Sequence, residues 1–270
     1  MRASFLFVLL LVGCGESSDS LDGEGGSGPA PEPTSVGLIE LSADPLGVKT
    51  PGGSSRLSAY FGSEPEINCG LIHEAGSCKT TGCNFFLQPE VTAKASAGEL
   101  SVSGIFDATA DEDMPGIYSL GRSATLWQPE GEVTVTASGN VVPAFEVSLQ
   151  TGAMFETPGW QEERPQSLAE DFVAPFTPFE GAVHLDFVTS VGGDGPSYFI
   201  ACDFDGASGE VRVPAASFAA IESPQPLDSG VLWISSRAAT ELVAGDYAIT
   251  VTADTMVAWT SLALTDQPRQ

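Results

Sequence analysis

The chain has 270 residues, and its 36 Asp and Glu against 10 Lys and Arg give a formal net charge of −26. Such a charge repels anionic phosphates, so the composition argues against nucleic-acid binding. Hydrophobic residues make up 42% of the chain and include 15 Phe. That is enough apolar material for a folded core, which excludes an acidic disordered tail.

The first 13 residues have the pattern of a signal peptide. Arg2 precedes the apolar run 5–12, which is less than half of the roughly 20 residues that a membrane span needs. The run ends in Leu-Val-Gly-Cys at 11–14, which looks like the lipobox of bacterial lipoproteins. That resemblance implies cleavage before Cys14 and acylation of this residue, palmitate included, which would anchor the mature chain in the membrane. In the enteric sorting rule, an Asp directly after the lipidated cysteine favours retention at the inner membrane. Because Gly15 follows Cys14, we expect the lipoprotein in the outer membrane.

Residues 14–35 form the lipidated end and a tether. After Cys14 the segment is rich in Gly, Ser and Pro and has only one large aliphatic residue, Leu21. Such a composition cannot bury a core and predicts a flexible linker. The folded domain is therefore expected over residues 36–266, with a potential sub-boundary in the proline-rich segment 152–178.

Beyond residue 36 the chain alternates apolar and polar residues in short runs. The clearest runs are 98–104, 132–137, 144–149, 182–188 and 247–252. Alternation with period two predicts antiparallel strands that have one buried and one solvated face. The sequence therefore predicts an all-β fold, an antiparallel β-sandwich that is either one large sandwich or two closely joined ones. At most one or two short helices are expected, and the best candidate is 214–222, which opens on a proline.

Four cysteines follow the lipobox, namely Cys69, Cys78, Cys83 and Cys202. In an exported chain they predict two disulfides with three alternative connectivities. If all four pair, Cys202 joins one of the three clustered cysteines and links the two halves of the sequence. A zinc site made of the three clustered cysteines and His73 is the alternative, but the two-residue spacings of structural zinc sites are absent.

The motifs of common enzymes are absent from the sequence. It contains no nucleophile elbow, no S-x-x-K pair, no zinc-binding H-E-x-x-H and no phosphate-binding Walker loop. His184 and Asp186 lie two residues apart on a predicted strand, so they share one face and could orient a base or bind a metal together. The simpler interpretation is a solvated strand face. A hydrolase that works through carboxylates stays open as an alternative to a non-catalytic protein.

Calcium is the most plausible ion, because hard cations take carboxylate and carbonyl ligands. One candidate site combines Asp203, Asp205, Ser208 and Glu210, which resemble the opening of a calcium loop. That run lacks a third acidic position and the twelve-residue spacing. The alternative for these residues is a solvated turn, and no other cofactor is predicted.

Four tryptophans could form a glycan-binding platform. Trp233 and Trp259 stand among apolar neighbours, so we expect both in the core. Trp160 lies in a polar, proline-rich stretch, where an exposed aromatic ring would indicate contact with a partner. The alternative for Trp160 is packing over the edge of the core.

Short motifs accompany the lipobox, the tether and the clustered cysteines. They are Val-Pro-Ala-Phe at 142–145, Cys-Asp-Phe-Asp at 202–205, Val-Pro-Ala-Ala at 213–216 and Gly-Asp-Tyr at 245–247. Together they resemble uncharacterised surface lipoproteins of predatory, gliding Gram-negative bacteria. The resemblance implies an exported β-rich domain with disulfides and no particular activity.

These features lead to one expected function and two alternatives. We expect a non-catalytic, lipid-anchored protein of the cell envelope, a binding or adhesion module for a protein or glycan partner. A carboxylate-dependent envelope hydrolase and a purely structural envelope component are the alternatives.

Overall fold

The computed structural model describes residues 33–45, 53–63, 69–83, 95–160, 163–190, 197–221 and 229–265. Within these residues the regular structure is almost entirely β-strand, with sixteen strands, one α-helix of five residues and one 3₁₀ turn. Most strand pairs are antiparallel, and only the pairs that strand β16 makes with β1 and β10 are parallel. The predicted all-β, antiparallel fold is confirmed.

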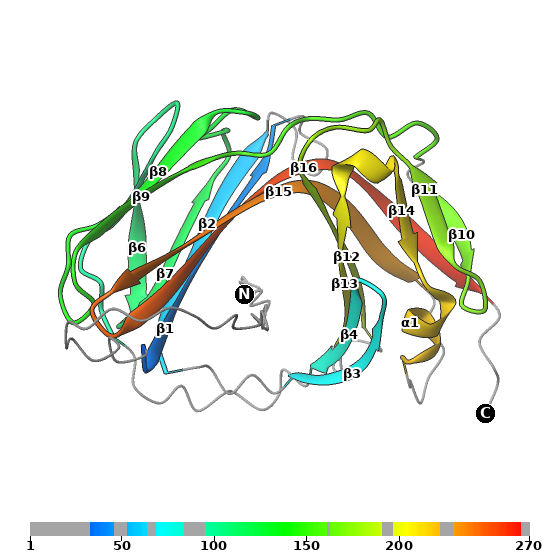
Figure 1. Cartoon of the computed structure of the whole chain (residues 1–270), viewed down its shortest axis with the longest axis horizontal. Coiled ribbons are helices and arrows are strands. Elements are labelled where there is room, and N and C mark those ends of the chain that lie inside the picture. The colour runs from blue at the N-terminus through cyan, green and yellow to red at the C-terminus, as the bar shows by residue number, and fades with distance from the viewer. Residues whose placement is uncertain are drawn as a thin grey trace, which may run out of the picture.

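Two sandwiches share one long hairpin. Strands β15 (Ser229–Ala244) and β16 (Tyr247–Thr265) pair antiparallel along their length and run from one sandwich to the other. In Figure 1 they bridge the top of an arch, with one sandwich on each side. A two-residue turn joins them, and Gly245 takes the positive φ of 60° that this turn requires.

The first sandwich is built by β1, β2 and the strands between residues 100 and 150. Its strands are β1 (Ser35–Asp44), β2 (Ser54–Gly62), β5 (Leu100–Ser103), β6 (Ala108–Met114), β7 (Ile117–Arg122), β8 (Glu132–Ala137) and β9 (Phe145–Gln150). Strand β6 connects the two layers, because its first half pairs with β5 and its second half with β7. Phe61, Tyr118 and Trp127 are the largest fully buried side chains of this core.

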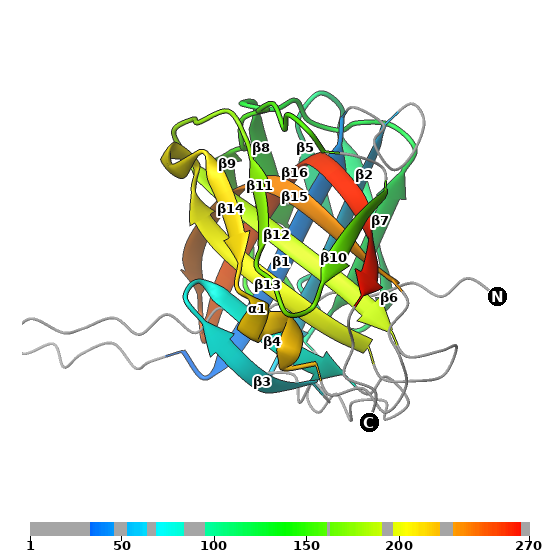
Figure 2. The ribbon, with the colours of Figure 1, turned by 90° about the vertical axis from the view of Figure 1, so that its right-hand side faces the viewer.

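The second sandwich combines an early hairpin with later strands. Its elements are β3 (Cys69–Ala75), β4 (Cys78–Cys83), β10 (Glu163–Ser167), β11 (Phe172–Pro175), β12 (Ala182–Ser190), β13 (Ser197–Asp205), the 3₁₀ turn Gly206–Ser208, β14 (Glu210–Val213) and α1 (Ala215–Ala219). Figure 2 shows β10, β11, β14 and α1 on the outer side of this sandwich. The two-stranded sheet β11–β14 and α1 cover β12 and β13, and Phe187 meets Phe218 edge-on at 5.4 Å.

Each of the five runs of alternating residues contains a strand of the structure, although 98–99, 104 and 144 lie outside β5 and β9. The predicted helix at 214–222 is the five-residue α1, with Pro214 as its N-cap. Among the described residues no helix is long and apolar enough to span a bilayer. Strand β16 continues far beyond the predicted 247–252. A bulge opposite Ile234 and Ser235 leaves Val257 and Ala258 buried in succession. This interrupts the alternation of the sequence, so the alternation does not reveal the full length of the strand.

Both predicted disulfides form. Cys69 pairs with Cys83, 14 residues away, and Cys78 pairs with Cys202, 124 residues away. Each bond joins residues that lie directly opposite each other on adjacent antiparallel strands. The four sulfurs are thus used, and no thiolate remains for the zinc alternative. Disulfides of this kind are typical of proteins outside the cytoplasm.

The long-range disulfide lies within the second sandwich. It ties β4 to β13, and both Cys78 and Cys202 pack in the second core. The link between the two halves of the sequence is therefore not a link between the two cores. What connects the cores is the β15–β16 hairpin, whose apolar residues enter both.

Candidate functional site

One side of β12 faces away from the second core and carries a group of charged residues. Val183, Leu185 and Phe187 point into that core and are fully buried. His184 and Asp186 therefore point to the opposite side of the sheet. Figure 1 shows that the sheet with β12 and β13 has β11 and β14 on one side and the inside of the arch on the other. The prediction that these two residues share a face is confirmed, and we call this side of the sheet the inner face.

His184 lies at the centre of this group. It is 0% exposed. Its Nδ1 lies 2.7 Å from Oδ1 of Asp203 on β13, and its Nε2 lies 3.1 Å from Oδ1 of Asp186. Because both ring nitrogens face carboxylates, the imidazole is bound as a doubly protonated cation.

The electrostatics of the site agree with this geometry. Burial alone would lower the pKa of His184, but the carboxylates of Asp186 and Asp203 outweigh it and raise this pKa to about 10. Burial would likewise raise the pKa of Asp186 and of Asp203, yet the pKa of both is lowered by His184, with a contribution from Arg237. All three groups are charged at neutral pH.

Arg237 and Asp254 extend the group onto the long hairpin. Arg237 on β15 donates from Nε and Nη2 to the two carboxylate oxygens of Asp254 on β16, each at 2.7 Å. Its Nη1 lies 3.9 Å from Oδ1 of Asp203. His184, Asp186, Asp203, Arg237 and Asp254 thus form one charged cluster over β13, β12, β15 and β16.

Two tryptophans stand beside the charged cluster. Trp233 lies opposite Asp186 in the register of β15 and β12, and its indole N–H donates to Oδ2 of Asp186 at 2.9 Å. Trp259 lies opposite Trp233 on β16. Both rings are partly exposed on the inner face, so the expectation that they belong to the core is wrong. Their apolar neighbours Leu232 and Ile234 point to the other side and fill the second core.

The sequence contained a signal for these residues. Trp233 stands between Leu232 and Ile234, which are buried on the other side of β15, and the period of two along a strand puts Arg237 on the same side as Trp233. Ser235 between them is buried. The partners of each residue on the neighbouring strands were not predictable, because they depend on the register between distant segments.

The calcium candidates do not come together around a common point. Asp203 holds His184, while the carboxylate of Asp205 accepts from the backbone N–H of Ala207 and caps the 3₁₀ turn. Glu210 pairs with Arg212 at 3.1 Å, and the Ser208 hydroxyl donates to the backbone oxygen of Asp205. In the described part of the chain no three His, Cys, Asp or Glu side chains are arranged to hold a metal ion.

Trp160 packs against the second core. Its ring meets Phe172 edge-on at 6.1 Å and is only partly exposed. The structure thus places this residue over the edge of the core, which is the alternative to an exposed contact. A candidate partner surface has to be sought elsewhere.

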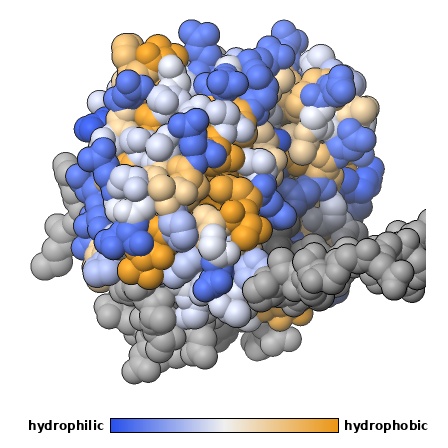
Figure 3. All heavy atoms as spheres, turned by 60° about the vertical axis from the view of Figure 1, so that its left-hand side comes forward, coloured by the Kyte–Doolittle hydropathy of each residue, from blue (hydrophilic) through white to orange (hydrophobic). Residues whose placement is uncertain are grey.

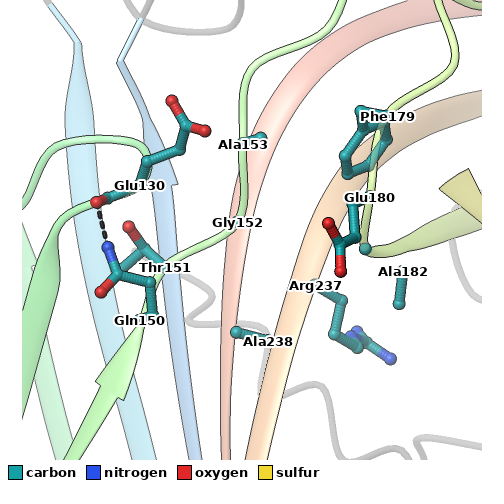
Figure 4. A pocket seen from close by; sticks show the side chains of 11 residues that line it. Glu130, Gln150, Thr151, Gly152, Ala153, Phe179, Glu180, Ala182, Arg237 and Ala238 are labelled. Carbon is teal, nitrogen blue, oxygen red and sulfur yellow. Dashed lines mark hydrogen bonds between the residues drawn. The ribbon is translucent and has the colours of Figure 1, made fainter.

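An open groove lies between the two sandwiches on the outer side of the arch. Its volume is about 340 Å³. Residues from β9, from the start of β12 and from the middle of β15 line it, and Arg237 of the charged cluster is among them. Figure 4 shows the carboxylates of Glu130 and Glu180 at its two sides. Both glutamates are exposed residues, so the groove does not offer the paired, water-poor carboxylates that a hydrolase of this class needs.

Exposed apolar side chains also occur on the first sandwich. Phe106, Val141 and Val243 are 61%, 63% and 67% exposed. On the side of the molecule that the first sandwich forms, hydrophobic residues lie among hydrophilic ones (Figure 3). Scattered apolar residues are common on protein surfaces and do not indicate a site. The inner face, with its charged cluster and its two tryptophans, is the candidate functional site.

No protein-family model matches the chain, and no curated protein matches it. Among solved structures it is similar to the N-terminal Ig1-2 module of the Drosophila receptor protein tyrosine phosphatase DLAR. The identity is 9% and the TM-score is 0.28, over 73% of this chain and 99% of that one. It is also similar to the Ig1 and Ig2 domains of DIP-gamma, with 9% identity and a TM-score of 0.15 over 72% and 98% of the two chains. The four N-terminal Ig domains of Dscam1 isoform 9.44 follow, with 6% identity and a TM-score of 0.15 over 79% and 55%.

Proposed function

We propose that this chain is a lipid-anchored protein of the cell envelope that binds a partner, a protein or a glycan, through the inner face of its sheet. The anchor is acylated Cys14, and the segment up to residue 35 is the tether. The lipobox-like ending of the apolar N-terminal run supports the anchor, and the two disulfides support a location outside the cytoplasm. The outer membrane is the proposed site of attachment.

The charged cluster carries the proposal for the inner face. Burying an imidazolium and a guanidinium costs desolvation energy, and well-packed apolar residues would stabilise a sandwich at least as well. Such a network holds side chains in fixed positions at a partly exposed surface, as recognition requires. It lies beside Trp233 and Trp259, and aromatic rings are enriched where proteins bind partners.

The same geometry supports a non-catalytic protein over a hydrolase. A general base needs a free nitrogen or a carboxylate that can take up a proton near neutral pH. His184 has both nitrogens engaged. The pKa values of Asp186 and Asp203 are lowered, chiefly by His184 once burial is overcome, whereas an acid catalyst of a glycosidase needs a raised one.

The anchor is tested on the full chain expressed in a Gram-negative host. We expect the N-terminal peptide of the membrane-extracted protein to begin at Cys14 and to carry acyl chains in its mass spectrum. The Cys14→Ala variant should leave the membrane fraction. A wild-type protein that is cleaved elsewhere, or that remains unacylated, would contradict the proposal.

The binding face is tested by cross-linking on intact cells and by capture of envelope glycans. We expect the wild type and the control variant Phe106→Ala to give the same products, because Phe106 is 61% exposed and belongs to the first sandwich. The double variant Trp233→Ala, Trp259→Ala should lose them while keeping its unfolding transition. Equal capture by all three proteins would rule out the inner face as the contact surface.

A further inference from the structure

Strand β3 forms one end of the long sheet. In the order of the strands it stands before β4, and among the described residues it pairs with β4 alone. Figure 2 shows it at the lower rim of the second sandwich, with no labelled strand beyond it. In an antiparallel pair, every second residue points its N–H and C=O away from the partner strand. The free side of β3 therefore carries a row of backbone donors and acceptors that another strand could pair with.

Two other edge strands are protected in ways that β3 is not. Strand β9 ends the sheet on the opposite side, but the residues next to it hold it beside β15. Gly152 lies against Ser236, and a Cβ atom added at Gly245 would lie 2.9 Å from Pro143. Strand β10 contains Pro165, which has no backbone N–H to donate. Strand β3 contains neither proline nor lysine, the residues that commonly keep an edge strand from pairing.

Two exposed apolar residues stand on β3. Leu71 is 58% exposed and Ile72 is 42% exposed. Leu71 lies opposite Thr81, whereas Ile72 packs over Gly82, where an added Cβ atom would lie 2.9 Å from its Cδ1. The two side chains are thus on opposite faces of the sheet. The pairing with β4 shifts at this point by a bulge, but the residues before and after it keep their register. A strand added to this edge would cover apolar surface on both faces.

Both disulfides hold this edge in place. The Cys69–Cys83 bond joins the open end of the β3–β4 hairpin, and the Cys78–Cys202 bond ties β4 to β13 near the turn of the hairpin. A strand that is already fixed loses little conformational freedom when another strand pairs with it. The edge of β3 is therefore preorganised for the addition of a strand.

The charge of the hairpin favours a second copy of this chain as the added partner. Residues 69–83 contain one acidic residue, Glu74, and one basic residue, Lys79, so the hairpin has no formal net charge in a chain of −26. These two side chains lie 3.7 Å apart, between Oε1 and Nζ. Two acidic copies repel each other least where their local charge is zero. A neutral edge also offers no charge with which to select a foreign strand.

We infer that two copies of this chain pair antiparallel through the free edges of β3 and join their sheets into one. A two-fold axis brings the same residues of both copies together, with Leu71 on one face of the joined sheet and Ile72 on the other. One strand pair buries less surface than a standard interface, so the dimer is weak and forms where the protein is concentrated. The inference is independent of the proposed function, because it uses the rim of the sheet and not the charged cluster or the tryptophans.

Photocross-linking of the full chain tests the pairing. Gly70 on β3 is exposed and is replaced by benzoylphenylalanine, because a Cβ atom there meets nothing within 4 Å. Gly121 on β7 is also exposed and equally open, and it carries the same label as a control. Two preparations with different affinity tags are mixed at micromolar to millimolar concentrations and irradiated. We expect the label at Gly70 to give a product with both tags, in a yield that rises with concentration, and the label at Gly121 to give none.

A charge on the edge should prevent the pairing. Leu71→Glu places like charges on both copies, and we expect it to lower the yield of the two-tag product by about tenfold at equal concentration. Phe106→Glu is the matched control and should leave the yield unchanged, because Phe106 is 61% exposed but belongs to the first sandwich. Higher salt should raise the yield, since it screens the repulsion between two acidic copies. Urea unfolding shows whether each variant remains folded.

Each outcome decides the inference. It is wrong if no two-tag product forms at any concentration, or if the label at Gly121 gives the same yield. It is also wrong if Leu71→Glu and Phe106→Glu lower the yield equally, because the association is then general. If the label at Gly70 on intact cells joins another envelope protein and not a second copy, the edge takes a foreign strand and the inference fails.

Hydrogen exchange locates the contact on the unlabelled chain. We expect the backbone amides of β3 to exchange more slowly at high than at low protein concentration, because the second copy accepts their hydrogen bonds. The amides of β7 should exchange at the same rate at both concentrations. Exchange in β3 that does not depend on concentration would overturn the inference.

Discussion

Arg237 and Asp254 lie directly opposite each other on β15 and β16, joined by two hydrogen bonds of 2.7 Å. This pair occupies the part of the hairpin that passes from one core to the other. On β16, Ala253 still packs in the first core and Val257 already packs in the second. The bidentate ion pair therefore links the two strands of the hairpin at the point where it passes between the two sandwiches.

The first prediction concerns this pair. Arg237→Lys keeps the charge but loses the planar fork that binds both oxygens of Asp254. We expect a loss of about 1–3 kcal/mol in the free energy of unfolding, because the hydrogen bonds are charge-assisted and the Arg237 side chain is only 11% exposed. Urea unfolding followed by tryptophan fluorescence measures it.

Arg212 offers a matched control. It also pairs with two carboxylates, those of Asp171 and Glu210, but its side chain is 55% exposed. Arg212→Lys should leave the urea concentration at the midpoint of unfolding nearly unchanged, because the pair is exposed to solvent. Equal losses for the two variants would mean that the Arg237–Asp254 pair stabilises the fold no more than an exposed ion pair does.

The second prediction concerns the protonation of His184. Asp186 and Asp203 raise its pKa to about 10 against the effect of burial, so the ring should remain doubly protonated from pH 6 to pH 9. The nitrogen chemical shifts of the ¹⁵N-labelled imidazole report this directly. A ring that loses its proton between pH 6 and pH 7 would contradict the assignment of an imidazolium.

The same group makes stability depend on pH. The pKa of His184 is about 6.5 in the unfolded chain and higher in the folded one, so its contribution is complete below about pH 6.5 and is lost as the pH rises toward 10. The pKa values of Asp186 and Asp203 are lowered in the fold, so their contribution is lost as the pH falls below about 4. The His184→Gln variant should show a flatter decline at high pH.

The strands were predictable because each exposes one face. Alternation identified the strands that cover 132–137 and 182–188, since a half-buried strand repeats every two residues. The same rule placed His184 and Asp186 on one face. The rule fails at the bulge in the hairpin, where Val257 and Ala258 are both buried.

The sequence did not predict which residues make up the candidate site. His184 was expected on a solvated face, yet it is fully buried because Asp203, Asp186 and Arg237 surround it. These residues come from three strands, and Arg237 lies more than 50 positions after His184, so no local pattern encodes their register. The positions of the cysteines predicted two disulfides but not that Cys78 is the partner of Cys202. Spacing alone does not decide between the three alternative pairings.

The third prediction compares the two disulfides. The Cys78–Cys202 bond closes a loop of 124 residues and the Cys69–Cys83 bond a loop of 14. Chain-entropy models assign them about 4–5 and about 3 kcal/mol. We expect the Cys78→Ala, Cys202→Ala variant to lose more stability than the Cys69→Ala, Cys83→Ala variant, also because Cys78 and Cys202 lie in the second core. The reverse order in urea unfolding would show that the β3–β4 hairpin depends more on its own bond.

The fourth prediction tests the contact of Gly152, one of the residues that line the outer groove, with the long hairpin. Gly152 follows β9 and lies against Ser236 of β15, and a Cβ atom added at Gly152 would lie 2.3 Å from Oγ and 2.9 Å from the backbone carbon of Ser236. The backbone of β15 is held in place here, because Ser236 lies opposite Val183 of β12 on one side and Thr255 of β16 on the other. Gly152→Ala should therefore push the chain after β9 away from the hairpin and cost about 1–3 kcal/mol of stability. Gly121→Ala on β7 is the control, because a Cβ there meets nothing within 4 Å. If both variants unfold at the same urea concentration, the segment after β9 has room to move away from Ser236. The groove lined by Glu130 and Glu180 would then not have a fixed shape.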